Sequence, residues 1–419
     1  MDVIYAPITG RGGAVTVVRL SGAWALEIAN TLAGGLPPPR QASLRPLRWQ
    51  GRVLDHALVT VFPNPHSFTG EDSAELDLHG GRAVFAAVAE ALVALGARPA
   101  EPGEFSRRAF LNGRMDLLEA EAMADLIAAE TEAQRVQAID GAGALQTSCT
   151  QWRESLRQVM AHQEALIDFP DEDLPPEVEA KLLRQIADLH QEMRDILAAA
   201  PAAERLREGL EFVILGAPNA GKSTLLNALA GEDVAIVSET PGTTRDAVGV
   251  RVALGGVPVH LTDTAGLRET EDYIEAEGVR RAQARAAKAD LIIAVAAPGA
   301  AFPATPENVP VLHVHTKADL GGEGVSAVTG HGMADLRTQL ANTAARLTDT
   351  KGTATLARPR QIACVRDTAE ALARALAVEE PELRGEELRA ASHALARLTG
   401  VIGVEEILDA VFSGFCIGK

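Results

Sequence analysis

The chain has 419 residues, of which 47% are hydrophobic and 4% aromatic, and a formal net charge of −18 at pH 7. That length predicts two or three domains with aliphatic cores. Three cysteines are too few for a disulfide framework, and residues 1–10 lack the features of a signal peptide, so we expect a cytoplasmic protein. The longest apolar run, Ala83–Leu95, is too short to span a bilayer, which argues against a membrane partner.

Residues 1–116 are predicted to form a compact α+β domain. Val15–Leu20 and Ala57–Phe62 resemble strands, Arg82–Leu95 is an amphipathic helix, and the turns are rich in Gly and Pro. The 11 arginines of this segment balance 11 carboxylates, so the whole net charge lies in residues 117–419. Any polyanion must therefore meet a local basic face rather than a general field.

Long helices are predicted after this domain, because from Met115 to Phe169 apolar residues recur at helical spacing with few breakers. A Pro-rich break at 169–176 separates them from a further helix. Beyond an insertion, helical texture resumes. The helix predicted before the insertion is Glu177–Ala200. Those predicted after it are Arg360–Val378, Glu386–Thr399 and Val404–Phe412. We therefore predict a helical domain in two parts, 117–207 and 351–419, around a third domain at 208–350.

The third domain contains Gly-Ala-Pro-Asn-Ala-Gly-Lys-Ser at 216–223, which matches the P-loop pattern G-x-x-x-x-G-K-[ST]. An expected strand, Leu210–Leu215, precedes it, and a helix begins at Thr224–Ala230. Backbone N–H groups would cradle phosphates, Lys222 would face the outer phosphates, and the Ser223 hydroxyl would hold Mg²⁺. A plain glycine-rich turn is the alternative, which eight matching positions in this setting disfavour.

Three later segments indicate that the predicted phosphate-binding domain is a GTPase. Asp-Thr-Ala-Gly at 263–266 follows the apolar run Val257–Leu261, where its Asp can hold the Mg²⁺ shell. Thr-Lys-Ala-Asp at 316–319 follows the predicted strand Val309–His315 and fits N-K-x-D except at its first position. Asp319 would accept from guanine N1–H and N2–H₂, and Thr316 would weaken or reroute one base contact. Ser-Ala at 326–327, after an expected last strand, fits the base-binding loop.

Further motifs lie outside the P-loop domain. In the first domain they are Gly10-Arg11-Gly12-Gly13, Val17–Ser21, Ser67–Asp72, Glu75–Gly81, Pro102–Ser106 and Ala109–Gly113; Ile167–Glu172 and the terminal Cys416-Ile417-Gly418-Lys419 follow. With these motifs the chain resembles, nearly end to end, the tRNA-modification GTPases of the TrmE/MnmE family. The resemblance implies a multidomain α/β and all-α fold: an N-terminal α+β folate-binding-like domain, a helical domain and an inserted Ras-like P-loop GTPase domain.

The resemblance also implies an activity. The family hydrolyses GTP and, with an FAD-dependent partner protein, adds a carboxymethylaminomethyl-type group to C5 of the wobble uridine of certain tRNAs. It implies a homodimer formed through the N-terminal domain, a hetero-oligomer with the partner, and a 5-formyl-tetrahydrofolate-type one-carbon donor. GTP hydrolysis is expected to need Mg²⁺, to be stimulated by K⁺, and to occur where two G domains meet.

The resemblance assigns residues to these ligands. The GTP-binding set is Asn219, Ala220, Gly221, Lys222, Ser223, Thr224, Ser238, Thr240, Gly242, Thr243, Thr244, Asp263, Thr264, Ala265, Gly266, Thr316, Lys317, Ala318, Asp319, Ser326 and Ala327. Mg²⁺ would be held by Ser223 and Thr244, and K⁺ by Asn219, Ser238, Thr240 and Thr243. The folate set is Arg19, Glu75, Arg114 and Lys419, although surface ion pairs are an equally good reading of any one of these.

Two catalytic groups of Ras-like GTPases cannot be assigned in this chain. Ras-like enzymes orient the attacking water with a glutamine, whereas this chain has Leu267 at that position, and no arginine finger can be assigned. The resemblance gives the water to Glu275 and the role of the finger to K⁺. Lys222 and Cys416 are the other catalytic candidates, although a single Cys is more often an inert packed residue.

Two other classes of function stay open at this point. A GTPase that assembles ribosomes would share the G domain and Leu267, but it would leave the N-terminal domain and the tail unexplained. A GTP-switched scaffold would use the long helices to bind partners and would carry out no modification chemistry.

Overall fold

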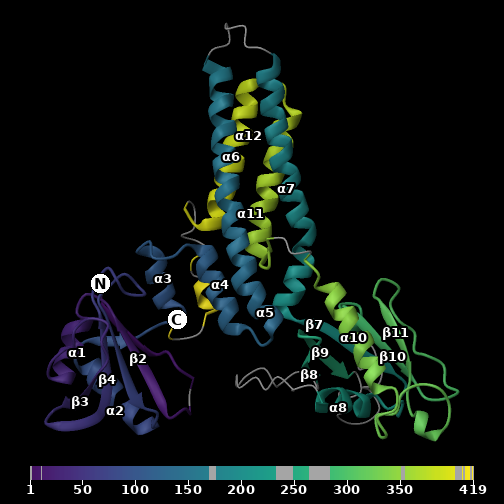
Figure 1. Cartoon of the computed structure of the whole chain (residues 1–419), viewed down its shortest axis with the longest axis horizontal. Coiled ribbons are helices and arrows are strands. Elements are labelled where there is room, and N and C mark those ends of the chain that lie inside the picture. Colours follow the sequence, from purple (N-terminus) through teal and green to yellow (C-terminus); the bar gives the residue numbers. More distant parts are fainter. Residues whose placement is uncertain are drawn as a thin grey trace. The chain divides into compact units, whose positions relative to one another are not determined.

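The structure is a computed structural model that describes residues 2–10, 12–168, 176–232, 249–263, 284–350, 354–401, 408, 411–415 and 418. The chain forms two compact units, Met1–Ala124 with Ala396–Lys419, and Asp125–Leu395. An α+β part, a set of long helices and a P-loop sheet are all present (Figure 1), which confirms the predicted fold class. The domain boundaries placed after residues 116, 207 and 350 stay predictions.

The first unit is built on a six-stranded sheet in the order β3-β4-β5-β2-β1-β6. Its elements are β1 (Val3–Pro7), β2 (Val15–Ser21), α1 (Ala25–Ala33), β3 (Ser43–Trp49), β4 (Arg52–Phe62), β5 (Ser73–His79), α2 (Arg82–Ala94), β6 (Ala97–Pro99) and α3 (Glu104–Leu111). Only β6 pairs in parallel, with β1. The predicted strand at 57–62 is confirmed and begins five residues earlier.

One face of this sheet packs on α1 and α2, because side chains alternate along each strand. In β5, Leu76 and Leu78 lie in the core with Ile28 and Leu92. The intervening side chains Glu75, Asp77 and His79 point to the opposite face. The face of the sheet opposite α1 and α2 therefore carries polar groups on β5.

Residues near the end of the chain also belong to the first unit. Phe412 and Phe415 pack with Leu117 in a small aromatic cluster. Gly418 adopts φ +100°, and a Cβ there would lie 2.3 Å from the Pro7 carbonyl oxygen, so only glycine fits. The predicted helix at 404–412 lies mostly outside the described residues.

The second unit contains the helical bundle. Its helices are α5 (Glu132–Val136), α6 (Ala142–Asp168), α7 (Pro176–Glu208), α11 (Pro359–Ala377) and most of α12 (Pro381–Thr399), with a π-helical turn at Gln137–Gly141. α4 (Leu117–Ala128), which precedes them, belongs mostly to the first unit. Figure 1 shows α6, α7, α11 and α12 running alongside one another. Within the described ranges no helix combines the length and hydropathy that a membrane span needs.

Two of these helices are longer than predicted. The helix predicted over 177–200 continues to Glu208, with Pro201 inside it. The helix predicted from residue 386 begins at Pro381, since proline is well tolerated in a first turn, where its missing N–H would have no helical partner.

The inserted domain is a five-stranded sheet in the order β11-β10-β7-β9-β8. Its elements are β7 (Leu210–Gly216), α8 (Lys222–Glu232), β8 (Gly249–Leu254), β9 (Val257–Asp263), β10 (Leu291–Ala296), β11 (Val311–His315), a 3₁₀ turn at Ala318–Leu320 and α10 (Met333–Leu347). All neighbours are parallel except β8 and β9. Its core is aliphatic, centred on Ile214, Leu261 and Ile293.

The strand expected before Ser326 is not formed. Gly321, Gly322 and Gly324 have φ angles of 99°, 118° and 131°, which a regular strand does not use. The segment turns instead and returns to β11 through a 2.8 Å bond from the Val325 N–H to the His315 carbonyl. That turn delivers Ser326 to the nucleotide site without a sixth strand.

Candidate nucleotide-binding site

The P-loop links buried strand β7 to helix α8. Asn219 and Gly221 have φ angles of 61° and 85°, so two of its residues are left-handed. Asn is one of the few side chains that tolerate this conformation. A Cβ at Gly216 would lie 2.6 Å from the Val295 carbonyl oxygen. The glycine pattern is therefore required by backbone geometry and by the close packing of β7 on β10.

The Lys222 ammonium donates 2.9 Å hydrogen bonds to the carbonyls of Gly216 and Ala217, and the residue is only 6% exposed. It thus folds back over the start of the loop, where its charge is available to a phosphate. Ser223 donates a 2.5 Å hydrogen bond from its hydroxyl to Asp263 Oδ2, at the end of β9. A hydroxyl and a carboxylate in contact are oxygen ligands of the kind that Mg²⁺ prefers.

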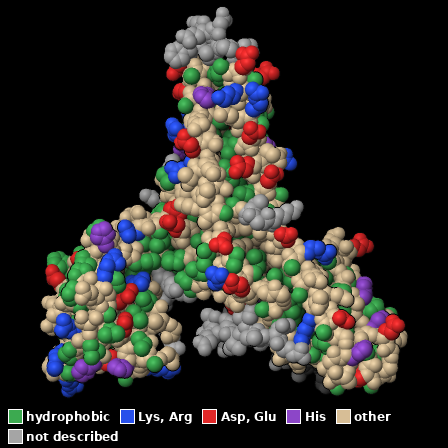
Figure 2. Space-filling view, in the orientation of Figure 1, with side chains coloured by type: hydrophobic (Ala, Val, Ile, Leu, Met, Phe, Trp, Pro, Cys, Tyr) green, Lys and Arg blue, Asp and Glu red, His purple; other side chains and the backbone are tan. Residues whose placement is uncertain are grey.

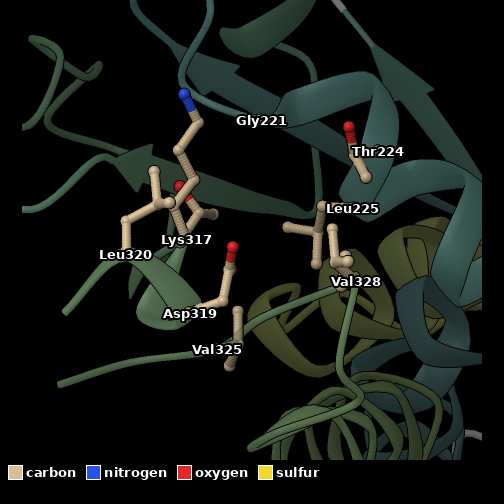
Figure 3. Close-up of a pocket in the computed structure, with 10 residues that line it drawn as sticks. Gly221, Thr224, Leu225, Lys317, Asp319, Leu320, Val325 and Val328 are labelled. Atoms are coloured by element: carbon tan, nitrogen blue, oxygen red, sulfur yellow. The ribbon is translucent and has the colours of Figure 1, made fainter. Parts of the chain in front are cut away.

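A pocket of about 170 Å³ lies between the P-loop helix and the segment that follows β11. Figure 3 shows Lys317 and Leu320 on one side of it, Leu225 and Val328 on the other, and Asp319 between them. Asp319 accepts a 2.6 Å hydrogen bond from the Ser326 hydroxyl, which fixes the orientation of the carboxylate. The pocket thus has apolar walls for a flat ring and a carboxylate that accepts hydrogen bonds from its edge.

A second polar cluster lies in the N-terminal sheet. Arg19 on β2 and Glu75 on β5 are cross-strand partners, with Nη2 2.8 Å and Nε 3.0 Å from Oε1. The guanidinium lies 4.9 Å from the Phe68 ring centre and 5.8 Å from that of Phe105. Arg114 is exposed, and its Cγ would lie 3.0 Å from a Cβ placed on Gly70. The structure therefore brings Arg19 and Glu75 into contact and places Arg114 against Gly70, two residues from Phe68 in sequence.

Comparison with known proteins identifies the family. The model of the MnmE helical domain matches residues 117–416, and that of the GTP-binding protein TrmE N-terminus matches residues 3–114. The chain belongs to the MnmE family. Its inserted P-loop domain is the family's GTPase (G) domain.

The relatives cover the chain from end to end. A tRNA modification GTPase MnmE from Acidiphilium cryptum (strain JF-5) is 61% identical over 100% of this chain and 99% of the relative. One from Gluconacetobacter diazotrophicus is 55% identical over 99% of this chain and 98% of the relative. Among solved structures, Era from Aquifex aeolicus is 23% identical over 41% of this chain and 68% of that chain, with a TM-score of 0.26.

Several residues that the MnmE resemblance assigns to the site lie outside the described residues. They are Ser238, Thr240, Gly242, Thr243, Thr244, Thr264, Ala265, Gly266, Glu275, Cys416 and Lys419, together with Leu267. Their roles stay predictions, as do the roles of the described P-loop and pocket residues.

Sequence reasoning missed a buried partner of His79. Asp55 accepts hydrogen bonds from the His79 backbone N–H (2.8 Å), its ring Nδ1 (2.7 Å) and the His56 N–H (2.8 Å). Burial alone would raise the pKa of Asp55, but these three donors lower it below its usual value. Its neighbour Asp77 lacks such donors in this cluster, and burial, reinforced by the charge of Glu75, raises the pKa of Asp77.

No local sequence signal pairs Asp55 with His79, which lie 24 residues apart. The aromatic partners of Arg19 were equally hidden, although Phe68 and Phe105 both lie in motifs noted above. The register between β4 and β5, which sequence alone leaves open, would have revealed the first contact, whereas Phe68 lies in a loop and Phe105 on α3, so the second depends on tertiary packing.

Proposed function

We propose that this protein hydrolyses GTP in order to modify tRNA. With an FAD-dependent partner, it adds a carboxymethylaminomethyl-type group to C5 of the wobble uridine of certain tRNAs. The observation that carries the proposal is the continuity of the nucleotide site. A P-loop with its lysine, the Ser223–Asp263 pair and a pocket with an oriented Asp319 follow one another along a single sheet edge.

In the proposed G site, the P-loop amides and Lys222 bind the phosphates, and Asp319 reads the guanine edge. Mg²⁺ is held by Ser223, whose hydroxyl already contacts Asp263, and by Thr244. K⁺ is held by Asn219, Ser238, Thr240 and Thr243, and it supplies positive charge near the β- and γ-phosphates. Glu275 orients the attacking water.

The proposed one-carbon site holds a 5-formyl-tetrahydrofolate-type donor with Arg19, Glu75, Arg114 and Lys419. A carboxylate such as Glu75 suits the amide–amine edge of a pterin, and arginines suit the anionic tail. Gly418 supports a role for the tail, since it lies against Pro7, next to Ala6, the cross-strand partner of Arg19. Cys416 is proposed as a catalytic thiol.

The proposed partners are a second copy of the chain, the FAD-dependent protein and tRNA, all in the cytoplasm. The open face of the N-terminal sheet supports homodimerisation, because Leu44 and Leu58 are cross-strand neighbours there and are 64% and 41% exposed. On the face drawn in Figure 2, basic and acidic side chains alternate over the helical bundle. Because neither charge dominates that face, we expect tRNA to bind at a local basic surface rather than across the whole face.

Mass spectrometry of tRNA nucleosides from a deletion strain tests this function. We expect the C5-modified wobble uridine to disappear, and to return with the wild-type chain but not with Lys222→Ala. Purification of the tagged chain should also recover an FAD-containing protein. Normal wobble nucleosides accompanied by a ribosome-assembly defect would replace the proposal with the assembly-factor alternative. Normal nucleosides and normal ribosomes would favour the scaffold.

A further inference from the structure

Thr316 occupies the first position of the guanine-reading segment, and its hydroxyl is already used. The residue is 3% exposed, and Oγ1 donates a 2.6 Å hydrogen bond to the carbonyl of Ala220 in the P-loop. A second carbonyl, that of Ala296, lies at 3.4 Å. A threonine hydroxyl has one proton, so a group bound in the pocket cannot receive it without breaking this bond.

The bond joins two loops that are 96 residues apart in sequence. On one side, Thr316 is fixed to the sheet by a 2.9 Å bond from its N–H to the Ala296 carbonyl. On the other, Ala220 is 3% exposed and precedes Gly221, where a Cβ would lie 3.5 Å from Thr316 Oγ1. The base-reading segment and the phosphate-binding loop are thus held at a fixed separation by one buried hydroxyl.

The other residues of the pocket can contact one edge and the faces of a guanine ring. Asp319 offers carboxylate lone pairs to N1–H and N2–H₂, and its Oδ1 is positioned by Ser326. The walls at Leu320 and Val328, 74% and 77% exposed, suit the ring faces. In Figure 3 the Lys317 side chain extends away from Asp319, so its ammonium nitrogen is the part of that side chain farthest from the carboxylate.

N7, on the opposite edge of the ring, is a hydrogen-bond acceptor that either a side chain or water can satisfy. Among the described residues that line the pocket, the remaining hydroxyl is that of Thr224 in the first turn of α8, and Figure 3 shows its oxygen pointing away from Asp319. An asparagine at 316 would bring two N–H donors, enough for both the Ala220 carbonyl and N7. Threonine has a single O–H donor, and in this protein that donor is bonded to the Ala220 carbonyl.

We propose that Thr316 is a positioning residue that ties the guanine-reading segment to the P-loop, and that this protein binds guanine without a side-chain hydrogen bond to N7. The inference rests on the proposed binding of GTP and deepens it. Recognition would then depend on the edge read by Asp319, with N7 left to solvent.

Competition between GDP and 7-deaza-GDP, in which a C–H replaces N7, tests the base contact in the full-length chain. We expect the two affinities of the wild type to agree within about twofold. Thr316→Asn should bind GDP more tightly and prefer it to 7-deaza-GDP by about 3–10-fold, the effect of one net hydrogen bond. A wild-type preference of that size, or a Thr316→Asn variant without one, would overturn the inference. Failure to bind GDP at all would instead remove the proposed function.

The positioning role is tested with Thr316→Val, which keeps the shape and removes the hydroxyl, and with Thr316→Ser, which keeps the hydroxyl. We expect Val to weaken GDP binding about 10-fold, because the buried Ala220 carbonyl loses its donor, and Ser to restore it. Thr338→Val, whose hydroxyl bonds its own helix at Ala334, is the matched control and should change nothing. Equal affinities in Val, Ser and wild type would refute the tether, as would a loss that Ser does not rescue.

Discussion

The guanidinium of Arg19 and the carboxylate of Glu75 face each other across adjacent strands, with Nη2 2.8 Å from Oε1. The side chains are 18% and 23% exposed, so both ends remain open to a ligand. Glu75→Ala or Arg19→Ala should weaken binding of 5-formyl-tetrahydrofolate about 10–100-fold, the range for a lost charged hydrogen bond, and should leave GTP binding intact. Calorimetry on the full-length chain measures both.

Arg52→Ala provides the control for this pair, since Arg52 is an exposed arginine of the same sheet. It should bind folate as the wild type does. Unchanged affinity in all three variants would remove Arg19 and Glu75 from the site.

Asp319→Asn should shift nucleotide preference from guanine towards xanthine. The carboxylate accepts two hydrogen bonds, whereas an amide both donates and accepts, as the xanthine edge requires. Competition between GTP and XTP measures the shift, with Asp335→Asn on nearby α10 as the control. Strong GTP binding with continued rejection of XTP would mean that Asp319 does not read the base.

Asn219 should make GTP hydrolysis depend on K⁺. Its loss should remove about 10²–10³-fold of rate, typical of one group that stabilises transition-state charge. Alanine strains the φ of 61°, whereas glycine does not. Both Asn219→Ala and Asn219→Gly should therefore be made, and both should abolish the difference between rates in KCl and NaCl at fixed ionic strength. Equal wild-type rates in the two salts would eliminate the K⁺ site.

The N-terminal unit should lose stability in acid. Hydrogen bonding to Arg98 lowers the pKa of Asp2. Burial alone would raise the pKa of Glu104, but bonds from Arg98, the Glu101 N–H and Arg108 lower it. Folding favours both charged forms, so their stabilisation is present above the unfolded pKa values of about 4 and is lost as pH falls through the lower folded values.

Urea unfolding of the full-length chain, followed by tryptophan fluorescence between pH 7 and pH 3, measures this loss. Glu104→Gln should destabilise the first unit by about 1–3 kcal/mol at pH 7 and reduce the acid-induced loss. Glu154 has a pKa lowered to about 2 by Arg157, yet that pair is solvent-exposed. Glu154→Gln should therefore leave the profile unchanged.

Gly418→Ala should release the tail from the first unit, since its Cβ would collide with Pro7. Gly414→Ala is the control, because a Cβ there meets only the Val411 carbonyl, at 3.9 Å. Hydrogen exchange of the C-terminal peptide should accelerate in the first variant alone. If the tail completes the folate site, folate affinity should fall with it; identical exchange in both variants would show that the contact is dispensable.

Sequence reasoning succeeded where chemistry is local. The P-loop, Asp263 and Asp319 could be located at or just beyond the carboxyl ends of β7, β9 and β11, because each motif needs specific residue types where a strand ends; their roles in binding stay predictions. It failed for contacts between residues that are far apart in sequence, and for some backbone conformations. Nothing local pairs Arg19 with Phe105, and the strand expected before Ser326 is replaced by a turn in which Gly321, Gly322 and Gly324 have positive φ angles. Pro201 lies inside α7 and Pro381 begins α12, whereas the predicted helices ended at residue 200 and began at residue 386.

The helical bundle is completed by parts of the chain that are made at different times. Helix α7 buries Leu182, Ile186 and Met193, and it packs against α11, which begins about 150 residues after α7 ends. At roughly 5–20 residues per second, the ribosome needs about 8–30 s to synthesise the intervening segment of about 150 residues, which contains the G domain. During that interval the N-terminal sheet and the G domain can complete their own cores, while the apolar stripe of α7 waits for its partner. A nascent chain stalled before residue 377 would expose that stripe to solvent and to chaperones.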